Sequence, residues 1–145
     1  MAKAIGMKVV AFDIFHIPGI EEQLGIPYVE MDELLAMSDF VSVHAPAVDG
    51  GALISAENIA KMKDGVVFID NARGELMDID AVTEAVESGK FGALFMDAFP
   101  GETGIIHVPH DEDIIRTPGM PYFKLKYLRS FVNVYHTPHL SLIHI

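Results

Sequence analysis

Arg73 lies directly after a short apolar run, and its position indicates a site for an anion. The run covers residues 66–69 and breaks into a polar turn before the arginine. An apolar run of this length, bounded by turn residues, is typical of a buried strand. A guanidinium group keeps its charge at neutral pH and can hold a carboxylate through paired hydrogen bonds. The sequence therefore predicts a fixed positive charge at the carboxyl end of a strand.

Other apolar runs also stop at polar or ionisable residues. The runs are residues 9–12, 40–43, 93–96 and 132–135, and they are followed by Asp13, His44, Asp97 and the pair His136 and His139. In an open α/β sheet the carboxyl ends of the strands share one edge, and ligands bind in the crevice outside that edge. We therefore expect these side chains to gather at one ligand site.

Strand-like and helix-like segments alternate along the chain, which predicts a parallel sheet with crossover helices. The predicted strands are residues 8–13, 40–44, 66–69, 93–97 and 132–135, with a brief extended piece at 28–29. The predicted helices are residues 20–24, which Gly25 ends, residues 31–37, and a helix that Ser55 caps and that ends near residue 62. A further predicted helix is capped by Asp78, has Val82, Ala85 and Val86 on its inner face and is followed by Gly89. Residues 98–121 are rich in Gly, Pro and charge and predict a loop over the site edge. The fold class is therefore α/β, with a doubly wound, Rossmann-like parallel sheet.

Two parts of such a fold are not found in the sequence. No GxGxxG turn lies between a strand and a helix. Residues 2–5 look like the last turn of a helix that Gly6 ends, and no strand precedes them. We therefore expect the first strand and the glycine-rich turn to be missing. In the strand order 3-2-1-4-5-6, that strand would lie between the strands that end at Asp13 and Asp70.

The charge balance and the absence of cysteine exclude several kinds of protein. The 145 residues include 21 acidic and 10 basic residues, which give a net charge of −11 and disfavour nucleic acids and anionic membrane surfaces as partners. With no cysteine, neither disulfides nor thiolate chemistry is available. No run approaches the length of a membrane span, and no signal-like apolar core follows the first residues. A cytoplasmic protein is expected.

Two histidine pairs have a spacing that can place metal ligands on one face of a helix. They are His107 with His110, and His136 with His139. Neither segment reads as a helix, and neither is completed by acidic or thiolate ligands. We therefore expect no metal site.

The motifs around these residues resemble the nicotinamide-binding domain of the D-2-hydroxyacid dehydrogenases, and within that family the D-lactate dehydrogenase branch. They stand in the family's order over residues 2–139. KVVAFD resembles the second strand with its ribose-binding acid, and SDFVSVHAP resembles the third strand with its HxP turn. AKMKDGVVFIDNARGELMDIDAV resembles the signature around the catalytic arginine, FMDAFPGE the segment with the catalytic glutamate, and VNVYHTPH the turn with the catalytic histidine.

The resemblance implies catalytic roles for Arg73, Glu102 and His139. Reduction of a 2-oxo acid by hydride requires the substrate carboxylate to be held and a proton to be delivered to the carbonyl oxygen. Arg73 would grip the carboxylate, and His139 would donate the proton, because imidazole titrates near neutrality. Glu102 would hold the imidazole ring and favour its charged form. On local grounds alone, Arg73 could instead pair with Asp70 or Glu75 on a solvated turn.

The same resemblance assigns NAD as the cofactor. Asp13 would accept hydrogen bonds from the adenosine ribose, and its charge would repel a 2′-phosphate, which favours NAD over NADP. The remaining cofactor contacts are assigned to Ala45 and Pro46 on the adenine side, to the backbone of Asn71 and Ala72, and to Asp97 beside the nicotinamide carboxamide.

The resemblance also predicts a partial chain. Residues 1–139 would form a partial NAD-binding domain, residues 140–145 an atypical tail, and the substrate domain of a full member would be absent. Such a fragment is expected to be inactive alone, and the full-length protein is expected to be a homodimer. Asp70 stands where relatives usually have asparagine, and Asn71 where they tend to have threonine, cysteine or a small residue, so local cofactor contacts are expected to differ.

Two functions from different classes remain consistent with the sequence. The favoured one is an NAD-dependent oxidoreductase that transfers a hydride between NAD(H) and a small D-2-hydroxy acid or 2-oxo acid, with D-lactate and pyruvate as the expected pair. Glycerate or a branched 2-oxo acid is a further possible substrate. The alternative is a nucleotide-binding sensor or corepressor-like interaction module of the same fold. A sensor has no need for Arg73, Glu102 and His139 together, which favours the enzyme.

Overall fold

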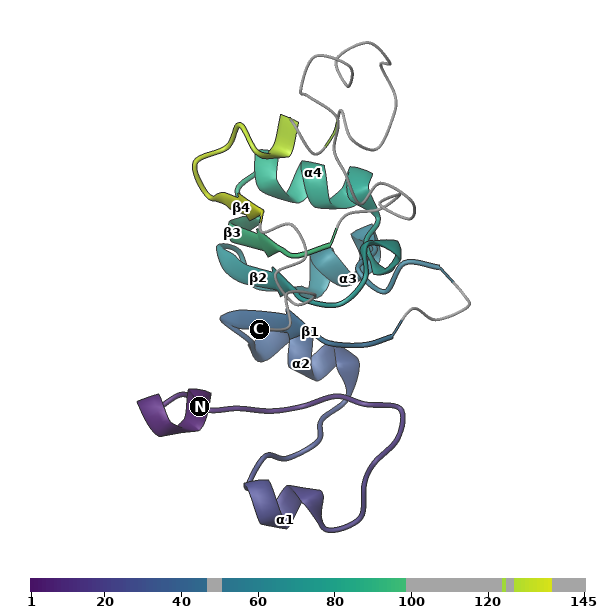
Figure 1. Cartoon of the computed structure of the whole chain (residues 1–145), viewed down its shortest axis with the longest axis vertical. Coiled ribbons are helices and arrows are strands. Elements are labelled where there is room, and N and C mark those ends of the chain that lie inside the picture. Colours follow the sequence, from purple (N-terminus) through teal and green to yellow (C-terminus); the bar gives the residue numbers. More distant parts are fainter. Residues whose placement is uncertain (47–50, 99–123, 125–126, 137–145) are drawn as a thin grey trace, which may run out of the picture.

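The computed structural model describes residues 1–46, 51–98, 124 and 127–136 (Figure 1). Within these ranges, the 3₁₀ helices are η1 (Ala2–Ile5) and η2 (Gly74–Leu76). The α-helices are α1 (Ile20–Leu24), α2 (Met31–Met37), α3 (Ala56–Lys61) and α4 (Ile79–Glu87). The strands are β1 (Phe40–Val43), β2 (Val66–Asp70), β3 (Phe91–Met96) and β4 (Val134–His136). From α2 to β3, helices and strands alternate as the sequence predicted.

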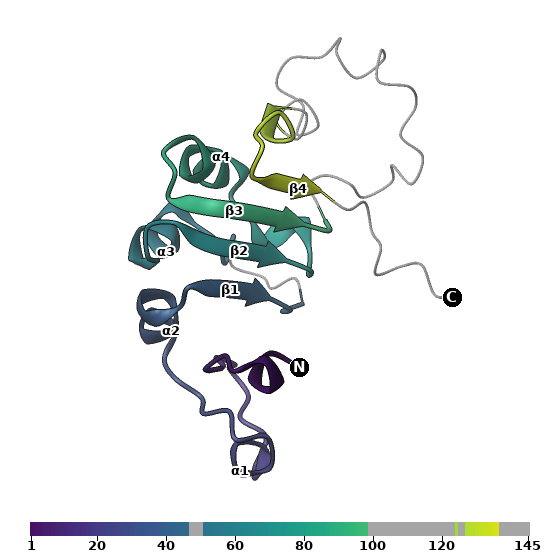
Figure 2. The same cartoon turned by 90° about the vertical axis from the view of Figure 1, so that its left-hand side faces the viewer.

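The strands of the described ranges form one parallel sheet in the order β1-β2-β3-β4 (Figure 2). Helices α3 and α4 make the crossovers from β1 to β2 and from β2 to β3. The register places Val43 opposite Asp70, Asp70 opposite Met96, and Met96 opposite His136. The predicted parallel, Rossmann-like sheet is therefore confirmed, and the carboxyl ends of its strands lie along one edge.

Helices α2, α3 and α4 stand in one row beside the sheet and close its core (Figure 2). Alternate strand residues point into this core, where Phe68 of β2 stacks on Phe91 of β3 with ring centroids 5.1 Å apart. Helix α4 buries Val82, Ala85 and Val86, which the helical spacing had predicted as its inner face. Full burial of a large apolar side chain contributes about 2 kcal/mol, so this layer holds the strand ends in place.

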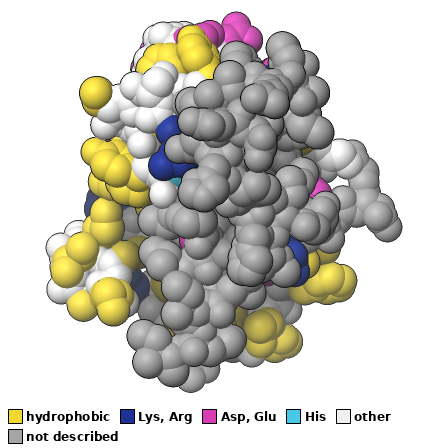
Figure 3. All heavy atoms as spheres, turned by 45° about the horizontal axis from the view of Figure 1, so that its top comes forward, with side chains coloured by type: hydrophobic (Ala, Val, Ile, Leu, Met, Phe, Trp, Pro, Cys, Tyr) yellow, Lys and Arg dark blue, Asp and Glu magenta, His cyan; other side chains and the backbone are white. Residues whose placement is uncertain are grey.

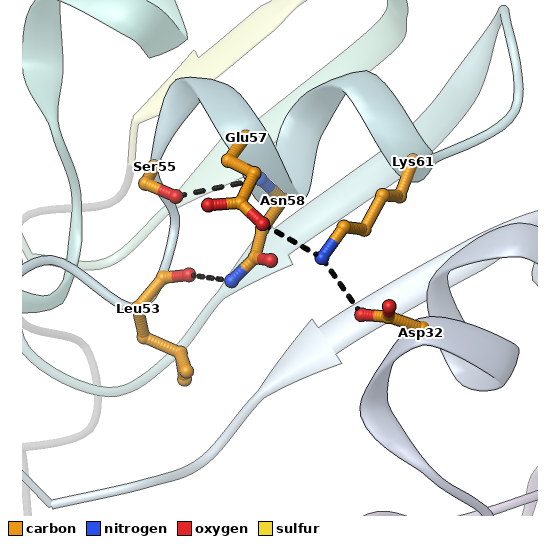
Figure 4. Close-up of polar contacts among 6 residues, drawn as sticks. All are labelled: Asp32, Leu53, Ser55, Glu57, Asn58 and Lys61. Carbon is orange, nitrogen blue, oxygen red and sulfur yellow. Dashed lines mark hydrogen bonds and ion pairs between the residues drawn. The ribbon is translucent and has the colours of Figure 1, made fainter.

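Helix α3 is fixed at both ends by polar contacts (Figure 4). The predicted cap Ser55 accepts a hydrogen bond from the Asn58 N–H at 3.3 Å, and Asn58 Nδ2 donates to the Leu53 carbonyl at 2.8 Å. At the other end, Lys61 Nζ lies 2.8 Å from Asp32 Oδ1 of α2. An N-cap oxygen satisfies a backbone N–H that has no partner within the helix, so the start of α3 follows from its own sequence.

Strand β3 begins two residues before the start that the sequence predicted. Gly92, predicted to precede the strand, lies inside it. A Cβ at Gly92 would meet the Gly65 carbonyl oxygen at 2.5 Å, and the Gly65 N–H donates to the Lys90 carbonyl at 2.9 Å. Glycine therefore allows the loop before β2 to close against the start of β3.

Residues 8–13 do not form a strand of the sheet, and this prediction is wrong. Among the described residues, Ala11 makes an isolated parallel bridge to Tyr28. The Ala11 N–H donates to the Pro27 carbonyl at 3.0 Å, and the Val29 N–H donates to the Ala11 carbonyl at 2.8 Å. An inner strand is stabilised by ladders on both sides, and this segment has a partner on one side. It therefore pairs locally with the brief extended piece at 28–29.

The predicted place of the missing strand is also wrong. Strand β1 occupies the position beside β2, with Val43 opposite Asp70. The piece at 28–29 bridges residue 11 in parallel and lies outside the described sheet. The described sheet therefore ends at β1. Its outer edge and residues 8–13 are the two places where a further strand would fit.

Several large hydrophobic side chains remain exposed on the described surface, where they are coloured yellow in Figure 3. On the strand face turned away from the core, Phe95 stacks on Tyr135 with ring centroids 4.6 Å apart, and the two are 39% and 49% exposed. Phe15 and Ile17 are exposed near the bridged segment. None of the helices within the described ranges is long and apolar enough to cross a membrane.

We expect the substitution Asp78→Ala to destabilise the fold through loss of the α4 cap. Asp78 Oδ1 accepts hydrogen bonds from the N–H groups of Asp80 and Ala81 at 3.0 and 3.2 Å. Loss of such a cap costs about 1 kcal/mol. The matched control is Glu84→Ala, which removes an exposed carboxylate from the same helix. Urea unfolding of both variants checks this, and an equal loss in the two would contradict the role of the cap.

Candidate functional site

The carboxyl edge of the sheet gathers the polar residues that end or follow its strands. His44 follows β1, Asp70 ends β2, Asp97 follows β3 and His136 ends β4. The Asp97 N–H donates to the Asp70 carbonyl at 2.9 Å, which ties two of these ends together. For His44, Asp97 and His136 the expected position at one edge is confirmed, and Asp70 lies at the same edge.

Arg73 is exposed on the turn that joins β2 to η2. Its backbone is extended, with φ −138° and ψ 135°, and its carbonyl accepts a hydrogen bond from the Leu76 N–H at 3.0 Å. Gly74 and Leu76 are buried and anchor the turn. Among the ion pairs of the described residues, none joins Arg73 to Asp70 or Glu75, so the pairing that the sequence left open is not formed. Within the described ranges the guanidinium group therefore forms no ion pair.

Asp70 is almost completely buried, with 1% of its surface exposed. Its Oδ1 accepts a hydrogen bond from the Ala72 N–H at 3.0 Å, whereas its buried Oδ2 has no hydrogen-bond partner among the described residues. Burial raises the pKa of Asp70 from 3.8 to about 6. The Ala72 N–H and the neighbouring His44 lower this pKa, and the Asp97 carboxyl raises it. This carboxyl group therefore titrates close to neutrality.

His44 and Asp97 flank Asp70 on the rim and differ in their surroundings. His44 is exposed, and its Nε2 lies 2.8 Å from Ser42 Oγ, within hydrogen-bond distance. Asp97 is 5% exposed and is followed by the buried Ala98. A carboxyl group at the strand ends can accept hydrogen bonds from ligand N–H and O–H groups, so the rim combines acceptor groups with the cation of Arg73.

Asp13 is not part of the sheet, because residues 8–13 form the isolated bridge and no strand of it. The carboxylate is exposed, and its Oδ1 accepts a hydrogen bond from the Phe15 N–H at 2.9 Å. Nearby, His16 stacks on Tyr28 with ring centroids 4.1 Å apart. Asp13 therefore ends a segment that is held locally, and the expectation that it shares the sheet edge is wrong.

The other residues assigned to the cofactor follow β1 and β2 at the rim. Ala45 is half-buried and Pro46 is exposed after β1, while Asn71 is exposed and Ala72 half-buried after β2. The Asn71 N–H donates to the Val43 carbonyl at 3.3 Å and so joins the two strand ends.

Two of the three predicted catalytic residues, Glu102 and His139, lie outside the described residues, as does the tail at 140–145. The same holds for residues 99–121 of the predicted loop. Within the described ranges no group of three His, Asp or Glu side chains is placed to hold a metal ion. Within the described residues, the candidate site therefore consists of the rim and Arg73.

Sequence reasoning overlooked the burial of Asp70 and treated it only as a departure from the family pattern. A signal was present, because Asp70 shares the alternation of Val66 and Phe68 and so lies on the same, buried face of β2. A carboxyl group that closes a run of inward-facing residues has to be buried with them.

Residues 1–141 match the sequence profile of the family described as "D-isomer specific 2-hydroxyacid dehydrogenase, NAD binding domain". The chain belongs to this family. The match includes the turn of Arg73 and every strand of the described sheet, so this Rossmann-like sheet is part of an NAD-binding domain.

Curated relatives and solved structures agree with this membership. The chain is 40% identical to a D-lactate dehydrogenase of Leuconostoc mesenteroides over 96% of its length and 40% of that protein. It is 37% identical to an aromatic 2-oxoacid reductase of Clostridium sporogenes over 92% of its length and 39% of that protein. The crystal structure of D-lactate dehydrogenase from Aquifex aeolicus complexed with NAD and lactic acid superposes with a TM-score of 0.82 at 33% identity, covering 98% of this chain and 42% of that one. The chain thus spans less than half of the length of these relatives.

We expect Asp70→Asn to change how stability depends on pH. The folded-state pKa of Asp70 is raised from 3.8 to about 6 by burial, so its contribution to stability is complete below the lower value and is lost as pH rises through the higher one. The uncharged amide avoids this loss. From about pH 4 to pH 7.5, the free energy of unfolding of the variant should therefore rise by on the order of 2 kcal/mol relative to that of the wild type. Urea unfolding at both pH values measures the difference, and a difference that stays constant with pH would contradict the titration of Asp70.

Proposed function

We propose that this chain is part of an NAD-dependent D-2-hydroxyacid dehydrogenase, which transfers a hydride between NAD(H) and a small D-2-hydroxy acid or 2-oxo acid. The observation that carries the proposal is the exposed guanidinium of Arg73, which forms no ion pair within the described ranges, at the carboxyl rim of an NAD-binding domain of this family. An arginine kept free of local carboxylates suits a substrate that brings its own.

Arg73 would bind and orient the carboxylate of the 2-oxo acid. The extended backbone at Arg73 and the buried residues Gly74 and Leu76 fix the base of this side chain. Because the backbone at Arg73 is fixed, the side chain loses less conformational entropy when it binds the substrate carboxylate. The fixed backbone also orients the carbonyl group of the bound substrate. The role of Arg73 is therefore binding and orientation, with no proton transfer.

Proton transfer is assigned to His139 and Glu102 on the strength of the family motifs. An imidazole donates a proton to the carbonyl oxygen during reduction and takes it back during oxidation. A carboxylate beside the ring favours the charged imidazole. Both residues lie outside the described ranges, and their roles rest on the sequence resemblance.

The rim also suits the cofactor, which supplies the hydride when bound. At the rim, Asp97 offers a carboxyl group for the carboxamide N–H donors, and the exposed carboxylate of Asp13, which lies outside the sheet, can accept from ribose hydroxyls. The negative charge of Asp13 disfavours a 2′-phosphate, so NAD is preferred over NADP. Ala45, Pro46 and the backbone of Asn71 would contact the cofactor from the same rim.

We further propose that residues 1–139 act as part of a longer protein that also contains a substrate domain. The matched relatives are more than twice as long as this chain. The outer edge of β1 and the bridged residues 8–13 would then take up a central strand between them. Such a strand would turn the local bridge at Ala11 into a ladder and place Asp13 at the rim.

Pyruvate and D-lactate are the proposed substrate pair, and rates with alternative acids test this. Steady-state reduction by NADH would be compared for pyruvate, hydroxypyruvate and an aromatic 2-oxo acid in the full-length protein, because relatives carry names for all three activities. We expect the highest kcat/KM with pyruvate. A higher kcat/KM with another 2-oxo acid would make that acid the preferred substrate of the same reaction. If none of these acids is reduced, the proposed dehydrogenase activity is wrong.

We expect Arg73→Lys to lower kcat/KM for pyruvate by about 100-fold, because lysine keeps the charge and loses the paired hydrogen bonds. The matched control is Arg129→Lys, since Arg129 is also exposed and precedes β4 at the opposite end of the sheet. Steady-state kinetics of both variants provide the measurement. Equal kcat/KM values for Arg73→Lys and the wild type would remove Arg73 from the substrate site.

A further inference from the structure

Asp70 has a position that packing stability does not explain. Its carboxyl group is buried beside Asp97, and its Oδ2 is a buried acceptor without a hydrogen-bond partner among the described residues. Burial of a carboxyl group with an unused oxygen destabilises a fold. A neutral side chain of similar size would avoid that loss at the end of β2. The hydrogen bond that the Asp70 side chain does make, from the Ala72 N–H, therefore points to a functional advantage of this carboxyl group.

The contact to Ala72 fixes the chain immediately before Arg73. Asp70 Oδ1 accepts from the Ala72 N–H at 3.0 Å, and this bond closes the turn that leaves β2. On the other side, the Leu76 N–H donates to the Arg73 carbonyl at 3.0 Å. The N–H of Asn71, in the same turn, donates to the carbonyl of Val43 at the end of β1 at 3.3 Å. The backbone is therefore held on both sides of an exposed guanidinium, and Asp70 supplies the side-chain part of that support.

We propose that Asp70 is a positioning residue for substrate binding, because its carboxyl group holds the turn from which Arg73 reaches the 2-oxo acid. The inference rests on the proposed function and adds a residue to it. Asp70 acts through the Ala72 backbone, since no ion pair of the described residues joins its carboxylate to Arg73. An ionised carboxylate accepts such a bond more strongly than a neutral acid does.

Three groups act on the Asp70 carboxyl from the elements around it. His44 faces it from the end of β1, Asp97 from the end of β3, and the Ala72 N–H from its own turn. Burial and Asp97 oppose the charge of the carboxylate, while the Ala72 N–H and His44 favour it. Together they bring the pKa of Asp70 to about 6. The turn is therefore held most strongly above that pH and more weakly below it, so substrate binding follows the same dependence.

Kinetics of two Asp70 variants in the full-length protein test this role. We expect Asp70→Ala to raise the KM for pyruvate at least about ten-fold at neutral pH, while the KM for NADH changes less than about three-fold, because the lost acceptor acts on Arg73. Asp70→Asn keeps an acceptor oxygen without the charge, so its KM for pyruvate at neutral pH should lie between those of the wild type and Asp70→Ala. The control is Asp39→Ala, which removes an exposed carboxylate from the amino end of β1.

The pH profile separates positioning from simple structural support. In the wild type the KM for pyruvate should rise as pH falls through about 6, and in Asp70→Asn it should stay level over the same range, because the amide cannot titrate. Equal increases in the KM for pyruvate and NADH in Asp70→Ala, or the same pH profile in Asp70→Asn and the wild type, would overturn the inference.

Hydrogen exchange at the Ala72 amide tests the turn without reference to turnover. The amide should exchange at least about ten-fold faster in Asp70→Ala than in the wild type, because its acceptor is lost, and Asp70→Asn should restore part of the protection. An unchanged exchange rate in Asp70→Ala would overturn the inference even if the dehydrogenase is active. If the wild type reduces no 2-oxo acid, the proposed function fails and the substrate role of Asp70 fails with it, whatever the exchange rate.

Discussion

The parallel register of β1 to β4 is the constraint on which the site depends. It aligns Val43, Asp70, Met96 and His136, and so brings residues that are far apart in the sequence to one edge. Because side chains alternate along a strand, a slip of one residue in β2 would turn Asp70 outward and bring Ile69 into the core. The core on that face, with Phe68 stacked on Phe91, makes such a slip unfavourable. Apolar packing thus determines where the polar rim lies.

The ends of the helices were predictable because their signals are local. Gly6 and Gly25 adopt the left-handed conformation at the ends of η1 and α1, and Ser55 and Asp78 cap α3 and α4 with their own oxygens. Strand pairing is not local. Residues 8–13 have the composition of a strand, yet their state depends on partners elsewhere in the chain, and periodicity in the segment carries no information about those partners.

The site was predictable to the extent that it follows from strand ends. Arg73, His44 and Asp97 were expected at the carboxyl edge because each follows an apolar run, and the parallel sheet places them there. The alternation of β2 indicates the burial of Asp70, but its raised pKa could not be predicted in full, because the charges of His44 and Asp97 come from other strand ends and leave no mark on the sequence around Asp70. Roles for Glu102 and His139 were available only through whole motifs, since an isolated acid or histidine in a loop is most often solvated.

Asp70 and Arg73 carry opposite charges three residues apart, and the structure keeps them from pairing. The Ala72 N–H occupies Oδ1 of the carboxyl group, and burial holds that group inside the sheet edge while the guanidinium is exposed. A direct ion pair would neutralise the cation that a substrate carboxylate needs, and the substrate would have to displace it. The turn separates the two charges, because its Ala72 N–H binds the Asp70 carboxylate while Arg73 remains exposed. The buried Asp70 Oδ2, which has no hydrogen-bond partner among the described residues, lowers the stability of the fold. This loss accompanies the separation of Asp70 from the cation of Arg73.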